Sequence, residues 1–262
     1  MYQLACELSV QFHFSEAVIS TNVLDHKVKT VVTEKNIYEP ELVISSADYH
    51  FTDTKLYPER FRSYSDAYWD KKTMAPSCLL YYVGLNKKLK NAVHHSLFFD
   101  TSFEKHGNEI YKNPQWPEAP LFYVSIPSIT DETAAPAGCE AMVFLIPVAA
   151  GLVGDTEALR EKYFQLILSR MEKHLGETIH DAVIFKKSYS VSDFSRDFNS
   201  FKGNAYGMAN TLMQTAIFRP SCRSKKIKNL FFAGQLTVPG PGVPPCLISG
   251  EVAAREAVKS FK

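Results

Sequence analysis

The residues best suited to chemistry lie near the carboxy terminus, in residues 234–245 (GQLTVPGPGVPP). Their three glycines follow an apolar strand expected over 228–234 and precede a helix expected over 248–258. Glycine lets a backbone approach a ligand closely, and the amino end of a helix offers unpaired N–H groups to a negatively charged oxygen. A flavin or a phosphate would fit such a junction. A tight connection whose glycines only supply positive φ angles is the alternative, and spacing alone leaves both open.

Other polar groups offer no clear acid or base, so the catalytic residues stay unknown. Asp193, Arg196 and Asp197 have helical spacing, and this pattern favours a solvated surface cluster over a catalytic group. His94 and His95 are adjacent, and in a strand they would point to opposite sides, which argues against a shared metal ion.

The five cysteines lie far apart and form no C-x-x-C pair. The sequence therefore predicts no metal site and a reducing compartment. Cys246 lies in an apolar turn and is interpreted as a packed thiol. Ser249 lacks the G-x-S-x-G elbow of a nucleophilic serine.

Length and charge restrict the class of partner. The 262 residues are enough for one large domain or two interleaved ones, and 29 basic residues nearly balance 28 acidic ones. This balance argues against a nucleic-acid partner. The amino terminus has no signal-peptide pattern, and no apolar run reaches the roughly 18 residues of a spanning helix. A cytoplasmic protein that touches a membrane only at its surface is expected.

The first third of the chain predicts a helix followed by a small sheet. Leu4, Leu8 and Phe12 have helical spacing, which indicates a helix to about Glu16. Three strands are expected next, over 18–23, 27–32 and 41–45.

The middle of the chain predicts an antiparallel sheet, because its apolar runs are rich in β-branched and aromatic residues. Its strands are expected over 77–85, 96–100, 121–126 and 140–148. A helix is expected over Thr156–Leu175, capped by Asp155 and ended by Gly176. A strand over 182–185 and an irregular stretch with one helix over 190–220 follow.

Residues 60–72 combine aromatic and basic side chains. A helix there would place Phe61, Tyr64 and Tyr68 on one face, as in helices that lie on a membrane surface. Packing of this helix on the sheet is the competing interpretation.

Residues 229–254 resemble the carboxy-terminal signature of bacterial and fungal phytoene desaturases, in which G-x-x-T-x-P-G-x-G-[VI]-P follows an apolar strand. Residues 43–49, 198–207 and 218–220 resemble other segments of that family, and the matches run in family order. The resemblance implies a mixed α+β and α/β fold. In it, part of a Rossmann-like FAD-binding domain is interleaved with an antiparallel-sheet substrate domain.

The resemblance also implies a division of the chain. Residues 1–50 would belong to the FAD-binding domain, 51–189 to the substrate domain, and 190–262 to the FAD-binding domain again. The implied activity is desaturation of phytoene or a related carotenoid, with hydride transfer to FAD. Two alternatives stay open. One is carotenoid isomerisation or oxidation by a related flavoprotein, and the other is a non-catalytic isoprenoid-binding remnant.

The resemblance places the cofactor contacts residue by residue. The flavin's ribityl and pyrophosphate part would lie against Gly234 and Gln235, and Val23 would contact the adenine. The first residues of the last helix would approach the isoalloxazine ring, namely Gly242, Val243 and Pro244.

The family's amino-terminal G-x-G-x-x-G turn is missing from this sequence. A carboxy-terminal portion, or one half of a split enzyme with a separate amino-terminal half, is therefore expected.

Aromatic residues would line a tunnel for the apolar substrate, and ordinary core packing is the alternative for each of them. They are Phe98, Phe99, Phe122, Tyr123, Phe144, Phe194, Phe198, Phe201, Tyr206 and Phe218.

Overall fold

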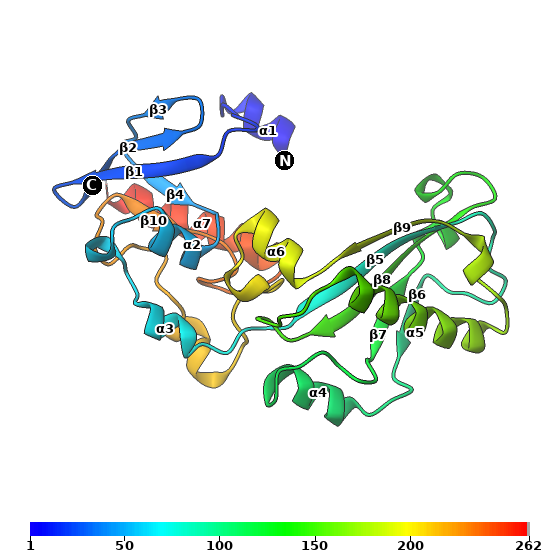
Figure 1. Ribbon diagram of the computed structural model, residues 1–262. Coiled ribbons are helices and arrows are strands. Elements are labelled where there is room, and N and C mark those ends of the chain that lie inside the picture. The colour runs from blue at the N-terminus through cyan, green and yellow to red at the C-terminus, as the bar shows by residue number, and fades with distance from the viewer. Residues whose placement is uncertain (261–262) are drawn as a thin grey trace.

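The computed structural model describes residues 1–260 and contains two assemblies of helices and sheets, with helix α6 between them (Figure 1). The chain runs from the first assembly into the second and returns to the first at its carboxy-terminal end. The fold is thus a mixed helix-and-sheet architecture, as the family resemblance implies.

The first assembly contains two small sheets. Its antiparallel sheet has the order β1 (Val18–Leu24), β2 (Lys27–Thr33), β3 (Ile37–Tyr38). Its second sheet is the parallel pair β4 (Val43–Ser45) and β10 (Leu230–Phe232). The helices are α1 (Tyr2–Glu7), α2 (Tyr49–Lys55), α3 (Asp66–Asp70) and α7 (Val243–Lys259).

The second assembly is a five-stranded antiparallel sheet with helices α4 (Phe103–Tyr111) and α5 (Glu157–Leu175). Helix α6 (Val191–Phe198) follows this sheet and lies between the two assemblies. The strand order is β6 (His95–Phe98), β7 (Phe122–Ser125), β8 (Glu140–Val148), β5 (Ser77–Leu85), β9 (Val183–Tyr189). Alternate residues of β5 and β8 are buried, and they share one core with the buried face of α5. This alternation is the period-2 pattern of a sheet that covers a core with one face.

The expected strands are present at nearly their predicted positions, and β3 is the strand that the sequence did not indicate. The first helix is shorter than predicted, because α1 ends at Glu7 and Ser9 has a positive φ of 65°. The last helix begins earlier than predicted, at Val243. The sequence did not indicate this start, because the two prolines in the first turn are also typical of a loop. Proline is nevertheless well tolerated in the first turn of a helix.

Helix α5 has the predicted bounds but a different cap. The Thr156 hydroxyl accepts a hydrogen bond from the Leu159 N–H, and Gly176 ends the helix with a left-handed φ of 69°. The predicted cap, Asp155, instead forms a bidentate ion pair with Arg160, at 2.7 and 2.8 Å.

The residues predicted as a surface cluster are partly buried. Asp193 is 7% exposed and accepts from Arg160 Nη1 at 2.8 Å, while Arg196 and Asp197 are exposed. The solvated-cluster interpretation is therefore wrong for Asp193. The guanidinium of Arg160 joins the start of α5 to the start of α6, which fixes how α6 leaves the sheet.

Residues 60–72 do not form one helix. A 3₁₀ turn at Glu59–Phe61 and the short α3 replace it. Phe61, Tyr64 and Tyr68 pack against the core of the first assembly, so the interpretation as a membrane-surface helix is wrong for this segment. Trp69, which is fully buried, anchors α3 in that core.

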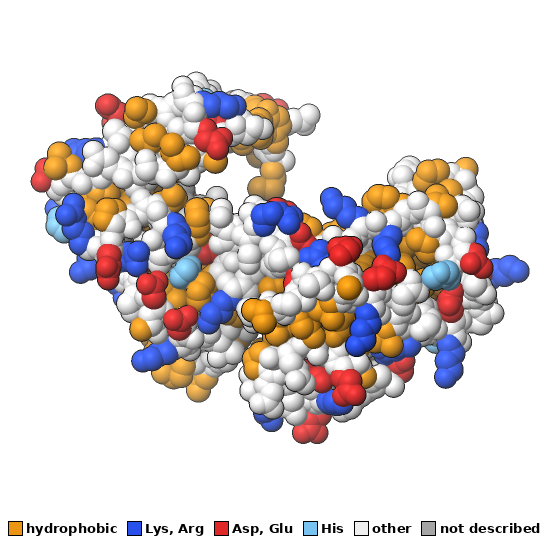
Figure 2. Space-filling model, viewed as in Figure 1, with side chains coloured by type: hydrophobic (Ala, Val, Ile, Leu, Met, Phe, Trp, Pro, Cys, Tyr) orange, Lys and Arg blue, Asp and Glu red, His pale blue; other side chains and the backbone are white. Residues whose placement is uncertain are grey.

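Charged groups of both signs are interspersed over the face seen in Figure 2. None of the helices in residues 1–260 is both long and apolar enough to cross a bilayer.

The Asp155–Arg160 ion pair predicts how the free energy of unfolding changes at acidic pH. Burial by itself raises the pKa of Asp155, but Arg160 and Ser192 together hold that pKa below its ordinary value of 3.8. A lowered carboxyl pKa stabilises the fold above the unfolded-state pKa, and this stabilisation is lost as the pH falls through the folded-state pKa. Asp155→Asn should cost about 3 kcal/mol of unfolding free energy at pH 7.

Urea unfolding at several pH values measures this effect. The gap between wild type and Asp155→Asn should shrink below about pH 4. The exposed turn residue Asp25, changed to Asn, is the control and should leave the free energy of unfolding nearly unchanged. A gap that stays constant down to pH 2 would contradict the assignment.

Candidate functional site

The parallel pairing of β4 with β10 creates the site. Leu230 lies opposite Val43, and Phe232 lies opposite Ser45. Just beyond the strands, the Ala233 N–H donates to the Ser45 carbonyl at 2.9 Å. Both chains therefore leave the sheet at the same edge, and the space outside the carboxyl ends of parallel strands is where ligands bind in such sheets.

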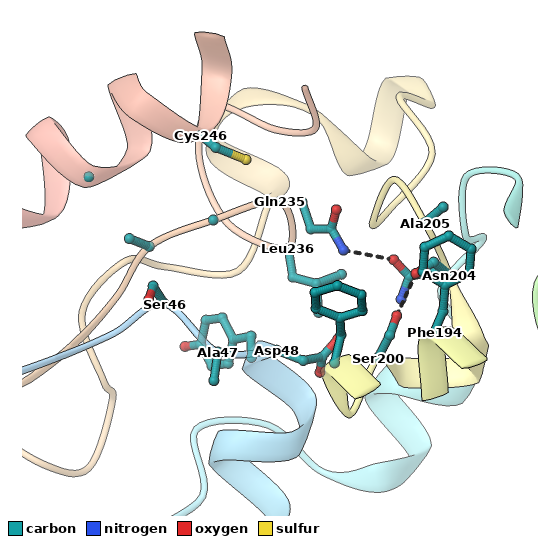
Figure 3. A pocket seen from close by; sticks show the side chains of 15 residues that line it. Ser46, Ala47, Asp48, Phe194, Ser200, Asn204, Ala205, Gln235, Leu236 and Cys246 are labelled. Carbon is teal, nitrogen blue, oxygen red and sulfur yellow. Dashed lines mark hydrogen bonds between the residues drawn. The ribbon is translucent and has the colours of Figure 1, made fainter. Parts of the chain in front are cut away.

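A cavity of about 490 Å³ lies at this edge (Figure 3). One wall is residues 46–49, which lead from β4 into α2, and another is residues 233–236, which follow β10. Residues from α6 and the loop after it, including Phe194 and Asn204, form a third wall, and Cys246 and Gly250 of α7 complete the lining. Segments that are far apart in the sequence thus meet at one cavity of the size that small ligands occupy.

Gly234 begins the turn after β10. Its φ is +114°, a value that side chains disfavour, and a Cβ atom there would meet only the Ser46 carbonyl, at 3.9 Å. Its N–H donates to the Ser249 hydroxyl of α7 at 2.9 Å. Ser249 is fully buried. The sequence offered no signal for its role beyond its place among the small residues of the last helix, such as Ala253. The hydroxyl fixes the turn against the helix.

Gln235 is held by a side chain on the opposite wall. Its Nε2 donates to Asn204 Oδ1 at 3.0 Å, as the dashed line in Figure 3 shows. Asn204 is almost fully buried, and its Oδ1 also accepts from the Gly207 N–H at 2.6 Å. The Gln235 side chain therefore stabilises the wall of the cavity. A ligand in the cavity would then contact the main-chain atoms of Gln235.

Arg219 stabilises the same turn through hydrogen bonds to main-chain oxygens. Its guanidinium donates to the Gln235 carbonyl at 3.2 Å and to the Met208 carbonyl at 3.2 Å. Gly240 lies so close that a Cβ there would be 3.0 Å from Arg219 Nη2. Burial lowers the pKa of Arg219. The role of Arg219 was not predicted, because its partners are main-chain oxygens brought together only by the fold.

Asp48 joins α2 to the loop after α6. Its carboxylate accepts from the Phe51 N–H and from the Phe201 N–H, each at 3.0 Å. Burial raises the pKa of Asp48, and these backbone donors oppose that rise. Both carboxylate oxygens are thus engaged within the protein, so Asp48 holds the cavity wall in place.

The predicted contact residues do not all meet at this cavity. Gly234 and Gln235 line it. Gly242, Val243 and Pro244 lie at the exposed start of α7 and are not among the lining residues. Val23 is in β1, where it packs partly buried against the core of the first assembly.

The predicted tunnel aromatics are divided among several places. Phe194 and Phe198 line the cavity at the strand ends. A second, apolar cavity of about 260 Å³ beside α4 includes Phe98, Phe99, Phe122 and Tyr123 in its lining. Phe144 is fully buried in the sheet core, which is the ordinary packing that the sequence left as the alternative.

The two adjacent histidines lie together, and the expectation that they point to opposite sides is wrong. The ring centroids of His94 and His95 are 4.0 Å apart. His94 lies just before β6, where strand alternation does not apply. Each ring bonds a hydroxyl, Thr130 for His94 and Tyr123 for His95, at 2.6 Å. In the described part of the chain no cluster of three or more metal-ligating side chains occurs.

Two solved structures that resemble this chain are oxidoreductases. An oxidoreductase from Methanosarcina mazei aligns with 97% of this chain and 52% of its own length, at a TM-score of 0.62 and 13% identity. Cyclohexylamine oxidase from Brevibacterium oxydans aligns with 94% of this chain and 48% of its own, at a TM-score of 0.52 and 9% identity. The chain therefore has the same kind of fold as these two proteins.

Sequence comparison identifies the family. Carotenoid 3,4-desaturase from Haloarcula japonica is 39% identical over 222 residues, which are 85% of this chain and 45% of that protein. Phytoene desaturase from Fusarium fujikuroi is 28% identical over 96% of this chain and 48% of its own length. No family model matches. The chain belongs to the carotenoid and phytoene desaturases, and it spans about half the length of the curated relatives it matches.

The hydrogen bond between Gly234 and Ser249 predicts that the turn after β10 depends on the serine hydroxyl. Ser249→Ala removes the acceptor of the Gly234 N–H and should lower the free energy of unfolding by about 1–3 kcal/mol, because a buried donor loses its partner. Urea denaturation measures the change. Ser169→Ala, on the exposed face of α5, is the control and should have little effect. Equal stability of the two variants would show that the bond does not hold the turn.

Proposed function

We propose that the chain contributes the carboxy-terminal half of an FAD-dependent carotenoid desaturase. Its family membership supports a carotenoid substrate, and the fold supports an oxidoreductase. The observation that carries the proposal is the cavity at the carboxyl ends of β4 and β10, bounded by the turn that begins with Gly234.

The lining of this cavity suits a flavin. Gly234 and Gly250 present main chain to it, and a Cβ at Gly250 would meet no protein atom within 4 Å. A flat group can approach such a wall closely. The polar side chains of Asp48 and Gln235 are engaged by protein groups, so the cofactor would be held by main-chain atoms and apolar contacts.

The residues around the cavity would bind and orient the cofactor. Gly234 and the main chain of Gln235 would lie against it, as the family resemblance implies. When bound, FAD supplies an acceptor for hydride from a saturated carbon of the carotenoid. Phe194 and Phe198 would exclude water from that side of the cavity and offer apolar area to the substrate, at about 25 cal/mol per Å² removed from water.

The proposal includes the partner and the location. Residues 1–50 and 190–262 would belong to the FAD-binding domain and 51–189 to the substrate domain, with a separate amino-terminal half completing the FAD site. Because a carotenoid resides in lipid, the assembled enzyme would work in the cytoplasm at the surface of a membrane. Val23 and the start of α7, including Gly242, Val243 and Pro244, would contact the cofactor only in that assembled form.

Flavin binding tests the cofactor site. Gly250→Leu adds a side chain at the cavity on α7, and leucine favours a helix over glycine by up to about 1 kcal/mol, so the fold should be retained. FAD titration of the chain, co-purified with the part of Haloarcula japonica carotenoid 3,4-desaturase that it does not match and followed by flavin fluorescence, should show affinity weakened about tenfold or more, equivalent to ~1.4 kcal/mol.

Gly107→Leu is the matched control. Gly107 is also a helical glycine with no atom within 4 Å of an added Cβ, but it lines the second cavity beside α4. This variant should bind FAD as wild type does. Equal weakening by both variants, or none by either, would place the flavin elsewhere.

The reaction is tested in cells that accumulate phytoene. The chain is expressed together with the part of Haloarcula japonica carotenoid 3,4-desaturase that it does not match. New conjugated double bonds should shift the absorption of the extracted carotenoids to longer wavelength. An isomerase would change the retention time of the product without adding a conjugated double bond, and unchanged phytoene would contradict the proposed activity.

A further inference from the structure

A basic pocket of about 450 Å³ lies where the chain enters β10, at the opposite end of that strand from Gly234. Residues 223–228 (RSKKIK) form one side of it, and His26 in the turn between β1 and β2 forms the other. Four of its seven lining residues are lysine or arginine, and none is acidic. In Figure 2, lysine and arginine side chains lie beside a histidine at the left end of the molecule, where Figure 1 shows this turn.

The charge of this pocket is local. The whole chain has 29 basic and 28 acidic residues, whereas residues 223–228 contain four cations within six positions. A concave surface lined by one sign of charge concentrates ions of the opposite sign. The pocket therefore attracts anions although the chain as a whole is nearly neutral.

Hydrogen bonds hold the basic loop in one conformation. The Ser224 hydroxyl accepts from the Lys226 and Ile227 N–H groups at 3.3 and 3.0 Å. The Lys225 N–H donates to the Ser63 hydroxyl at 3.2 Å. Ile227 is 2% exposed and belongs to the core of the first assembly. The lysine side chains thus extend from a backbone that is already fixed, so little backbone entropy is lost when a ligand binds.

Two hydrogen bonds fix the turn between β1 and β2 against this loop. The Lys228 N–H donates to the His26 carbonyl at 2.7 Å. His26 Nδ1 donates to the Lys226 carbonyl at 2.9 Å, because a carbonyl oxygen only accepts. His26 and Lys226 are 200 positions apart in the sequence. The tertiary fold therefore forms the pocket, and the basic run alone does not.

The cations of the pocket lack carboxylate partners. In residues 1–260 none of the four forms an ion pair, whereas other exposed lysines, such as Lys105 and Lys186, do. Lys225 instead lies over the ring of Tyr64, with its Nζ 3.9 Å from the ring centroid. Like charges that are held together repel one another, and a bound anion removes this repulsion.

We infer that this pocket binds a phosphate group, carried either by a lipid headgroup or by a soluble phosphate compound. Lysine binds phosphate as a compact positive charge. A volume of about 450 Å³ also admits part of the molecule that carries the phosphate. The pocket lies at the other end of β10 from the cavity proposed for FAD, so its ligand does not depend on the proposed function.

Replacing two lysines tests the pocket. Lys226→Gln combined with Lys228→Gln removes two of the four cations and keeps every main-chain hydrogen bond of the loop. Arg223 and Lys225 stay unchanged, because their side chains also lie over aromatic rings. The double variant should bind a phosphate probe about tenfold or more weakly than wild type, since half of the attracting charge is lost.

Two probes separate the sources of phosphate. Flotation uses vesicles of phosphatidylcholine with or without phosphatidylglycerol, and calorimetry uses inorganic pyrophosphate. Flotation only with phosphatidylglycerol, weakened in the double variant, would identify a lipid headgroup. Binding of pyrophosphate without flotation, weakened in the double variant, would identify a soluble phosphate compound. Binding of neither probe, or unchanged binding by the double variant, would overturn the inference.

Lys112→Gln combined with Lys187→Gln is the matched control. Both lysines are exposed on the second assembly, and their loss changes the net charge by the same amount. This variant should bind the probes as wild type does. Equal weakening by the two double variants would show an effect of net charge alone and would overturn the inference.

Lysine footprinting gives a readout that does not depend on a variant folding. The wild-type chain is acetylated with and without the probe that binds, and mass spectrometry measures the rate at each lysine. The probe should slow acetylation of Lys226 and Lys228 but not of Lys112 and Lys187. Unchanged rates at Lys226 and Lys228 would overturn the inference.

Discussion

The parallel contact between β4 and β10 is the constraint on which the site depends. It joins segments from opposite ends of the chain, and no local interaction could bring them together. Asn229 strengthens the contact, because its buried side chain accepts from the Val28 N–H at 2.8 Å and donates to the Val28 and Glu41 carbonyls at 3.0 Å. One amide thus ties β2 and the approach to β4 onto β10. Leaving those buried backbone groups unpaired would cost about 1–3 kcal/mol each.

Aromatic packing holds the same contact from one face. The rings of Tyr49 and Phe232 stack with centroids 3.6 Å apart, and Trp69 lies 5.6 Å from Tyr49. This cluster places α2 against β10, and α2 begins where the cavity wall contributed by β4 ends. Burial of three rings contributes several kcal/mol, more than any single polar contact of the site. The cavity is therefore positioned by apolar packing, while its hydrogen bonds determine the shape of its wall.

The sequence predicts the sheet strands and α5 well, because period-2 and helical patterns report directly which face is buried. It fails where tertiary contacts override a local pattern. Residues 60–72 have helical spacing, yet Trp69 and its aromatic neighbours turn inward and break the helix. At the site, the glycine turn could be predicted from its residues, whereas Arg219 could not. Its partners are the main-chain oxygens of Gln235 and Met208, and main-chain atoms leave no pattern in a sequence.

The two assemblies differ in how far they can stand alone. The core around the five-stranded sheet has 22 buried apolar residues, whereas the core around β10 has 10. The smaller core also borders the cavity, because Tyr49 and Leu236 belong to both. Stability grows with the fraction of surface buried, so the first assembly gains most from a ligand that buries further apolar surface. A ligand bound in a cavity of the assembly with the smaller core would therefore stabilise that assembly by mass action.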